Sequence, residues 1–303
     1  MNRSILDEIA AKTRLRVAKA QETVPFEQLR EQALKIEGVG TRECGSLSVY
    51  DNNTPRLQTP PPSPQSPVPK NPSPQKPQSP IFEQALTAPG LSFICEIKKA
   101  SPSKGIIAED FPYLAIAREY EEAGAAAISV LTEPEYFLGS NRYLQEIAAN
   151  VKIPTLRKDF IVDAYQIYEA KILGAQAVLL ICAILDTDTI ARFIKTAGEL
   201  GLSSLVEIHN ESEAEQAVTA GAKIIGINNR DLKTFTVDTG MSARLRKLIP
   251  SGIITVAESG IKSPDDVRAL RDTGIDAVLA GESLMRAANR KQFLAELKAA
   301  YNP

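Results

Sequence analysis

The sequence predicts an α/β fold: a (β/α)₈ TIM barrel with an N-terminal helical extension and a Pro-rich insertion. Eight short apolar runs, rich in β-branched residues, alternate with helical segments over about 220 residues, which is the repeat that such a barrel needs. Several helical segments end in a glycine just before the next run, as a left-handed helix C-cap requires. No GxGxxG pattern follows the first run. The pattern therefore favours a closed barrel over an open, dinucleotide-binding sheet.

Residues 1–36 are predicted to form a helical extension. Ser4 can cap a helix, and Asp7 lies near the positive end of the helix dipole. A second helical piece is expected after Pro25. We expect this extension to cap a domain. Its apolar residues recur at roughly helical spacing: Ile5, Leu6, Ile9, Leu15 and Val17.

Residues 37–80 are predicted to be a flexible linker rich in proline and serine. Eleven of the 20 prolines lie between Pro55 and Pro80, and residues 51–80 contain no aromatic side chain. Such a segment buries too little apolar surface to offset the entropy lost on ordering, so an extended chain is expected. Its PxxP patterns fit aromatic grooves, but any proline-rich linker generates such matches.

Residues 81–303 are predicted to form the catalytic barrel. Near-continuous apolar strands joined by helices are typical of a parallel sheet that helices cover. The chain is long enough for a substantial core. The eight predicted strands are residues 93–98, 127–132, 154–159, 177–182, 204–209, 224–229, 254–259 and 277–282.

Composition and charge exclude several classes of protein. The formal net charge of −2 gives no basic field for nucleic acid or an anionic membrane. The longest apolar run, Ala177–Leu185, is too short to span a bilayer, and the charged N-terminal residues lack the apolar core of a signal peptide. Three widely spaced cysteines form neither a disulfide framework nor a metal pattern. These features predict a cytoplasmic protein that binds neither nucleic acid nor membrane.

Polar residues follow the predicted strands at the end where barrel enzymes carry their active sites. Glu96 and Lys98 alternate on the first strand, so both side chains are expected to point into the barrel mouth. The alternative interpretation is a salt-bridge network that closes the barrel. The strand ends carry Glu96, Lys98, Arg157, Lys158, Asp159, Glu207, His209, Asn228, Asn229, Arg230, Asp231, Glu258, Ser259, Gly281, Glu282 and Ser283.

The last two strands indicate a phosphate site. Gly260 follows the seventh strand, and Gly281 follows the eighth, where a new helix is predicted to begin. Ser263 is a candidate N-cap, with Pro264 at the first helical position. Backbone N–H groups after these two strands form the usual phosphate site of the fold. The sequence therefore predicts a small phosphorylated substrate.

The available side chains indicate acid–base and electrostatic catalysis. His209 is the single histidine, and a structural or supporting role is favoured for it, because Glu207 is the better-placed inward residue. No cysteine–histidine cluster and no carboxylate set has the spacing of metal ligands. The chemistry must then come from lysine, glutamate, asparagine, arginine and serine.

Six motifs follow one another along the predicted barrel. They are EIKKASPSKG (96–105), LRKDFIV (156–162), LVEIHN (205–210), IGINNRDL (225–232), VAESGI (256–261) and LAGESLM (279–285). In this order they resemble the indole-3-glycerol phosphate synthase family of tryptophan biosynthesis. The resemblance covers residues 82–303, and residues 5–20 are similar to the extra N-terminal helix of that family, which packs near the barrel mouth. The insertion at 37–80 departs from the usual family pattern.

The resemblance implies a lyase that closes an indole ring. The substrate would be 1-(2-carboxyphenylamino)-1-deoxyribulose 5-phosphate, and decarboxylation and dehydration would give indole-3-glycerol phosphate. No cofactor and no metal is implied. Association with other tryptophan-pathway enzymes is left open. Lys158 matches the general acid and Glu207 the general base, whereas Glu96 and Lys98 match a pair implicated in binding and dehydration. How these four divide the steps is open.

The resemblance also assigns the rest of the site. Asn228, counted with the catalytic residues, and Arg230 match positions that orient the substrate. Ser101 and Ser259 match contacts near its anthranilate and phosphate ends. The remaining binding positions are Glu258, then Gly260, Gly281 and Glu282 as backbone donors to phosphate, and Phe137 and Phe160 beside the aromatic ring.

Two alternatives remain at this stage. One is another phosphate-binding barrel enzyme, such as a phosphoribosylanthranilate isomerase or a triose or pentose phosphate enzyme. The EIKKASPS and LRKDF motifs on their expected strands argue against it. The other is an inactive barrel that acts as a scaffold through its proline-rich arm, and the presence of each expected ionisable residue argues against it.

Overall fold

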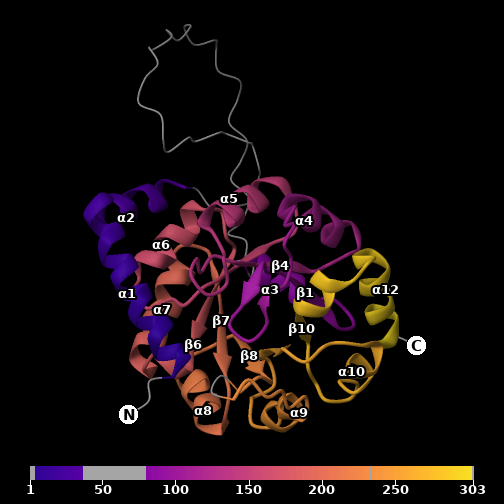
Figure 1. Cartoon of the computed structure of the whole chain (residues 1–303). Coiled ribbons are helices and arrows are strands. Elements are labelled where there is room, and N and C mark those ends of the chain that lie inside the picture. The colour runs from indigo at the N-terminus through magenta and orange to yellow at the C-terminus, as the bar shows by residue number, and fades with distance from the viewer. Residues whose placement is uncertain (1–3, 37–79, 232–233, 302–303) are drawn as a thin grey trace, which may run out of the picture.

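A computed structural model describes residues 4–36, 80–231 and 234–301. Its eight-stranded sheet closes on itself, and each strand pairs in parallel with its neighbours in chain order (Figure 1). The predicted (β/α)₈ barrel is confirmed. Each predicted strand is present, within two residues at either end. The barrel strands are β1 (Ser92–Ile97), β4 (Ala127–Leu131), β5 (Thr155–Lys158), β6 (Ala177–Ile181), β7 (Ser203–Ile208), β8 (Ile224–Asn228), β9 (Ile254–Glu258) and β10 (Ala277–Ala280).

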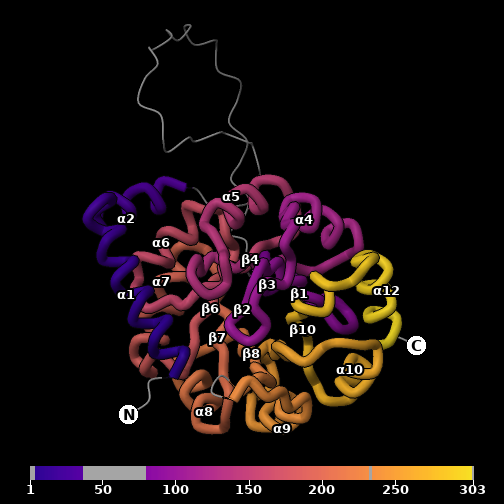
Figure 2. Tube along the Cα trace, in the orientation of Figure 1, coloured from indigo at the N-terminus to yellow at the C-terminus, as the bar shows by residue number. Residues whose placement is uncertain are grey.

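Helices surround the strands as an outer ring (Figure 2). Four helical segments end at a glycine with positive φ, as predicted, namely Gly124, Gly174, Gly221 and Gly274. This lets the chain turn back toward the next strand. The ring contains α4 (Tyr113–Glu122), α5 (Asn141–Asn150), α6 (Tyr165–Ile172), η1 (Cys182–Ile184), α7 (Thr187–Glu199), α8 (Glu211–Thr219), α9 (Gly240–Arg246), α10 (Pro264–Arg268), α11 (Glu282–Arg286) and α12 (Arg290–Tyr301).

The barrel interior has two parts: an apolar core in its lower half, toward α3, and a charged layer at the C-terminal ends of the strands. Alternate residues of the strands fill the lower part, for example Ile94, Leu156 and Val256. Helix α3 (Ile81–Leu86) closes the bottom, because Phe82 and Leu86 are buried in this same cluster. With the bottom filled by apolar side chains, the polar residues at the strand C-termini face an opening at the other end only.

The N-terminal extension forms two helices, α1 (Ile5–Thr23) and α2 (Phe26–Lys35), beside α6 and α7 (Figure 1). Ser4 caps α1 in a capping box with Asp7, as predicted. Helix α2 packs on α6 through an edge-to-face contact of Phe26 with Tyr168, whose ring centroids are 5.4 Å apart. The predicted linker, residues 37–80, lies outside the described residues except for Pro80.

Candidate active site

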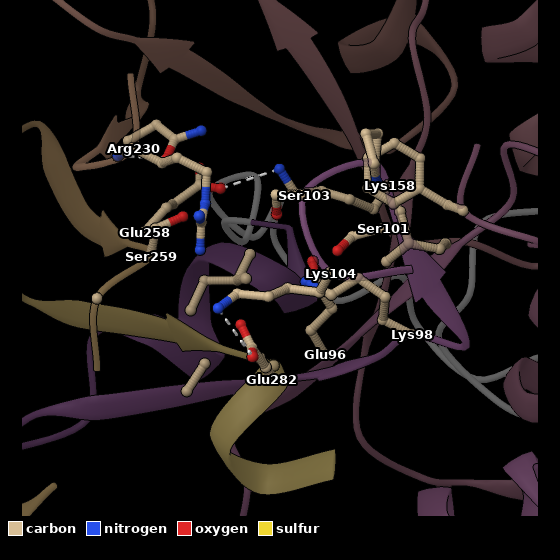
Figure 3. Close-up of a pocket in the computed structure, with 18 of the residues that line it drawn as sticks. Glu96, Lys98, Ser101, Ser103, Lys104, Lys158, Arg230, Glu258, Ser259 and Glu282 are labelled. Atoms are coloured by element: carbon tan, nitrogen blue, oxygen red, sulfur yellow. Dashed lines mark hydrogen bonds and ion pairs between the residues drawn. The ribbon is translucent and has the colours of Figure 1, made fainter. Parts of the chain in front are cut away.

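A cavity of about 750 Å³ opens at the C-terminal ends of the strands. The labelled side chains of Figure 3 reach into it from several strands and loops. The structure brings together in its wall all fourteen site residues named from the sequence. They are Glu96, Lys98, Ser101, Phe137, Lys158, Phe160, Glu207, Asn228, Arg230, Glu258, Ser259, Gly260, Gly281 and Glu282.

Lys158 is the central cation of the cavity floor. It ends β5, and its Nζ donates to Glu207 Oε2 on β7 at 2.8 Å and to Glu258 Oε2 on β9 at 3.0 Å. The side chain is 13% exposed, so the ammonium is held mainly by carboxylates rather than by water. One cation therefore faces two carboxylates that come from strands far apart in the sequence.

Burial and unequal charge set the protonation of this cluster. Burial opposes a charged Lys158, but attraction to Glu207, Glu258 and Glu96 outweighs it and raises the lysine pKa. Burial likewise opposes ionised Glu207, yet Lys158 and His209 hold its pKa well below the usual range. Burial and the like charges of Glu207 and Glu96 raise the pKa of Glu258 to about 7, against the attraction of Lys158. At neutral pH Lys158 is therefore charged and Glu207 is ionised, while the Glu258 carboxyl group can bind or release a proton.

Glu96 and Lys98 form an ion pair on the cavity side of β1, so the predicted alternation is confirmed. Two glycines make room for the buried carboxylates. A Cβ at Gly281 would lie 2.4 Å from Glu96 Oε1, and one at Gly226 would lie 2.0 Å from Glu258 Oε1. Glycine at 281 therefore leaves room for the Glu96 side chain. The sequence analysis assigned Gly281 only to the close approach of a ligand.

Arg157 lies on the opposite face of β5 from Lys158. Its guanidinium donates to the carbonyl oxygen of Gln166 at 2.8 Å and pairs with Glu169 of α6 at 2.7 Å and Asp159 at 3.2 Å. Of the two adjacent cations, only Lys158 lines the cavity. Arg157 instead fixes the loop after β5 against the helix ring.

Two aromatic rings form one side of the cavity. The centroids of Phe137 and Phe160 are 6.0 Å apart, with a 40° angle between the rings. Buried carboxylates hold their backbones: Glu133 Oε2 accepts from the Phe137 N–H at 3.1 Å, and Asp159 Oδ1 accepts from the Phe160 N–H at 2.8 Å. The positions of the two rings relative to each other are therefore set by two carboxylates.

The N-terminal helix completes this side of the site. Arg16 of α1 reaches both carboxylates, at 3.1 Å from Asp159 Oδ1 and 3.5 Å from Glu133 Oε1. The expected packing of the extension near the barrel mouth is thus observed. Three apolar residues of α1 also line the cavity, namely Ile5, Leu6 and Ile9. The sequence predicted them only as apolar positions of a helix that caps a domain, because an amphipathic helix gives no local signal for which apolar residues face a ligand.

A short hairpin covers part of the opening. It consists of β2 (Ala100–Ser101) and β3 (Gly105–Ile106), and it places Ser101 in the cavity wall. Lys104 at its tip lies 3.7 Å from Glu282 at the start of α11 (Figure 3). The sequence reading did not assign Lys104, and only its position inside the SPSKG motif could have indicated it.

The loops after β9 and β10, where the sequence predicts the phosphate, line a further part of the cavity. Ser259 and Gly260 both have positive φ, 64° and 91°, so the backbone makes a sharp turn at this point. Pro264 opens α10, and the Ser263 N–H donates to Asp266 at 2.8 Å, which agrees with the predicted helix start. Further residues that line this part are Lys262, Ser283 and Arg286.

Asn228 and Arg230 are linked at the end of β8. Asn228 Oδ1 accepts from the Arg230 N–H at 3.1 Å, and the Arg230 guanidinium donates to the carbonyl oxygen of Phe235 at 3.2 Å. Both line the cavity. Within residues 4–36, 80–231 and 234–301, no group of three or more histidine, cysteine, aspartate or glutamate side chains is arranged to hold a metal ion.

A family model described as indole-3-glycerol phosphate synthase matches residues 64–297. The chain belongs to this family. Curated relatives of the same description include one from Ruminiclostridium cellulolyticum, 49% identical over 97% of this chain and 98% of that one. Another, from Endomicrobium trichonymphae, is 59% identical over 72% of this chain and 84% of that one. A third, from Lacticaseibacillus paracasei, is 43% identical over 97% and 98%.

Indole-3-glycerol phosphate synthase is a carboxy-lyase of tryptophan biosynthesis that acts on a small phosphorylated substrate. The family membership decides against the alternatives of a different sugar-phosphate barrel enzyme and an inactive scaffold. Among solved structures, KGPDC from Streptococcus mutans is similar with a TM-score of 0.56 and 13% identity, covering 70% of this chain and 97% of that one. This likeness supports the barrel fold alone. In the described part of the chain, no helix combines the length and apolar character needed to cross a membrane.

Proposed function

We propose that Lys158 is the general acid and Glu207 the general base of the indole-3-glycerol phosphate synthase reaction in this protein. The observation that carries the proposal is the contact of the Lys158 ammonium with Glu207 on the floor of the cavity, 2.8 Å apart. A proton donor and an acceptor within hydrogen-bond distance can serve successive steps on one bound substrate.

The order of steps follows from the chemistry of the substrate, 1-(2-carboxyphenylamino)-1-deoxyribulose 5-phosphate. The ring carbon that bears the carboxylate attacks the ketone carbon, and the ketone oxygen takes a proton from Lys158 as it becomes a hydroxyl group. The carboxylate then leaves as carbon dioxide, which restores the electron pair to the ring. In the last stage Lys98 gives a proton to the hydroxyl group, which leaves as water, and Glu207 removes a proton from the methylene carbon next to the ring nitrogen. Loss of that proton makes the indole ring aromatic.

Glu96 and Lys98 support the dehydration in this proposal. Their ion pair lines the same cavity as Lys158 and Glu207. Lys98 therefore offers a second ammonium group for the leaving hydroxyl group. Glu258 contacts Lys158 from the other side, and its pKa of about 7 lets it return a proton to the lysine between turnovers. The three carboxylates and two lysines then form one proton-handling cluster.

The two ends of the substrate are held by different means. Phe137 and Phe160 are proposed to hold the aromatic ring, supported by their tilted arrangement and fixed backbones. Ser101, Asn228 and Arg230 would orient the carboxylate and the hydroxyl groups. The phosphate would lie at the loops after β9 and β10, where it is bound by Ser259 and by backbone N–H groups of Gly260, Gly281 and Glu282.

The replacement Glu207→Gln tests the assignment of the base. Glutamine keeps the size and a hydrogen-bonding oxygen but cannot accept the proton. Substrate affinity is expected to stay within a few-fold of the wild type, while turnover falls by roughly 10²–10⁴, the usual contribution of general base catalysis. Near-normal turnover in a folded Glu207→Gln variant would exclude Glu207 as the base.

We also propose a cytoplasmic location and a three-part chain: an extension at 1–36, a linker at 37–80 and a catalytic barrel at 81–303. The reduced, unpaired cysteines Cys95 and Cys182, both buried, support the location. Separate expression of residues 81–303 tests the division: the barrel should fold alone, with lower substrate affinity because Arg16 is missing. Failure of that fragment to fold would argue that extension and barrel are one unit.

A further inference from the structure

His209 directly follows β7 and lies next to Glu207, outside the set of residues that line the cavity. Its side chain is 13% exposed. The imidazole lies between two carboxylates: Nε2 is 3.4 Å from Glu207 Oε1, and Nδ1 is 3.0 Å from Glu213 Oε2. Nδ1 is hydrogen-bonded to Glu213, whereas Nε2 makes no hydrogen bond within the described residues and lies only within ion-pair distance of Glu207. A doubly protonated ring places a positive charge between the two carboxylates.

The geometry around Glu213 explains why the ring takes this orientation. Glu213 lies in the first turn of α8, and it accepts from the His209 backbone N–H at 2.8 Å as well as from the ring. Its other oxygen accepts from the Asn210 side chain at 2.8 Å, while Asn210 caps the helix. The first turn of α8 therefore holds the ring on its Nδ1 side, and Nε2 is directed at Glu207.

Glu207 consequently has one cation at each oxygen. Lys158 contacts Oε2, and the imidazole faces Oε1. Burial opposes a charged imidazole, but Glu207 and Glu213 raise the His209 pKa to about 10, so the ring is an imidazolium at neutral pH. In the proposed function Lys158 gives up its proton during the reaction. At that moment the imidazolium becomes the remaining cation beside Glu207.

We propose that His209 is a positioning residue for the general base: as an imidazolium it directs Glu207 Oε2 toward the cavity and keeps the carboxylate ionised while Lys158 is neutral. This inference rests on the proposed role of Glu207 and adds a residue to it. His209 itself does not touch the substrate in this arrangement, because Glu207 stands between the ring and the cavity.

Several charged or titratable groups act on this pair from the surrounding elements. Lys158 on β5 lowers the pKa of Glu207, and Glu213 on α8 raises that of His209. The Cys182 thiol of η1 has its own pKa raised to about 12 by burial and by both glutamates, so it stays neutral at working pH. Glu96 and Glu258 act on Lys158 from β1 and β9. Among these groups, the imidazolium is the cation placed on the Oε1 side of Glu207.

Two replacements of His209 separate orientation from charge. In His209→Gln, a neutral amide can still donate to Glu207 Oε1, whereas His209→Leu removes both donor and charge. We expect kcat to fall roughly tenfold in His209→Leu, which loses the cation beside the base, and to fall less in His209→Gln. KM should change little in either. Loss of the cation should raise the pKa of Glu207 and so move the acid limb of the kcat–pH profile to higher pH in both variants.

A double-variant cycle shows whether His209 acts through Glu207. In a Glu207→Gln background, His209→Leu should have no further effect on kcat, because the group that it positions has been removed. Multiplicative effects, or a wild-type pH profile and kcat in His209→Leu with only lower thermal stability, would overturn the inference and leave a structural histidine. Retained turnover in Glu207→Gln alone would instead overturn the proposed function.

Discussion

Replacing Lys158 by methionine perturbs the centre of the site with little change in side-chain length. The replacement removes the ammonium that lies 2.8 Å from Glu207 and 3.0 Å from Glu258. Those two side chains are 4% and 2% exposed, so water cannot take the place of the lost cation. The variant therefore contains buried carboxylates without their shared partner.

The structure sets the size of the expected losses in stability and in turnover. Removing one partner of a buried ion pair costs about 3–5 kcal/mol when the other stays charged. Here the cost depends on pH, because Glu258, with a pKa already about 7, can bind a proton instead. Stability should therefore fall more at about pH 8 than at about pH 6. If Lys158 is the general acid, as proposed, its loss should lower turnover by roughly 10²–10⁴, or about 3–6 kcal/mol of transition-state stabilisation.

Fluorescence of the indole product measures turnover, and circular dichroism with urea unfolding measures folding. Lys171→Met is a matched control, because Lys171 is also a buried lysine but lies on α6, outside the cavity wall. The control should keep wild-type turnover. A folded Lys158→Met protein with turnover within about threefold of the wild type would refute the assignment, since a general acid contributes far more.

Three further predictions concern the surroundings of this centre. Glu258→Gln should remove a pH dependence: the folded state holds the Glu258 proton up to about pH 7 and the unfolded chain only to about 4.5, so wild-type stability falls as pH rises between them. In urea unfolding, the free energy of unfolding of the variant minus that of the wild type should then rise by up to about 3 kcal/mol between pH 5 and pH 8. A difference that stays constant over this range would contradict the prediction. Arg16→Met should raise KM roughly tenfold, because Glu133 and Asp159, which hold the backbones of the two phenylalanines, lose their cation. Lys12→Met, on the same helix, loses only the exposed ion pairs of Lys12, such as that with Glu135, and should leave KM unchanged. Equal effects of the two replacements in steady-state kinetics would contradict the prediction. Gly281→Ala should lower kcat by displacing Glu96, and a raised KM with normal kcat would instead assign Gly281 to phosphate binding alone.

Local patterns in the sequence determined the elements and much of the site. The alternation of Glu96 and Lys98 followed from the two-residue period of a strand, and the structure confirms that both line the cavity. Glycines such as Gly124 and Gly174 marked helix ends, because only the local backbone conformation is at issue there. The N-cap Ser4 was recognisable for the same reason. Each of these features depends on neighbours within a few residues along the chain.

Tertiary structure alone decided how the charges pair and which residues serve them. Lys158 meets carboxylates 49 and 100 residues away, and those contacts exist only because the barrel closes. The choice between Arg157 and Lys158 as the inward cation also depends on it, since packing of α6 gives Arg157 its partners on the outer face. Gly281 has to be small because a carboxylate from β1 occupies the space beside it. Contacts of this kind depend on how distant strands are brought together, and no local pattern in a single sequence records them.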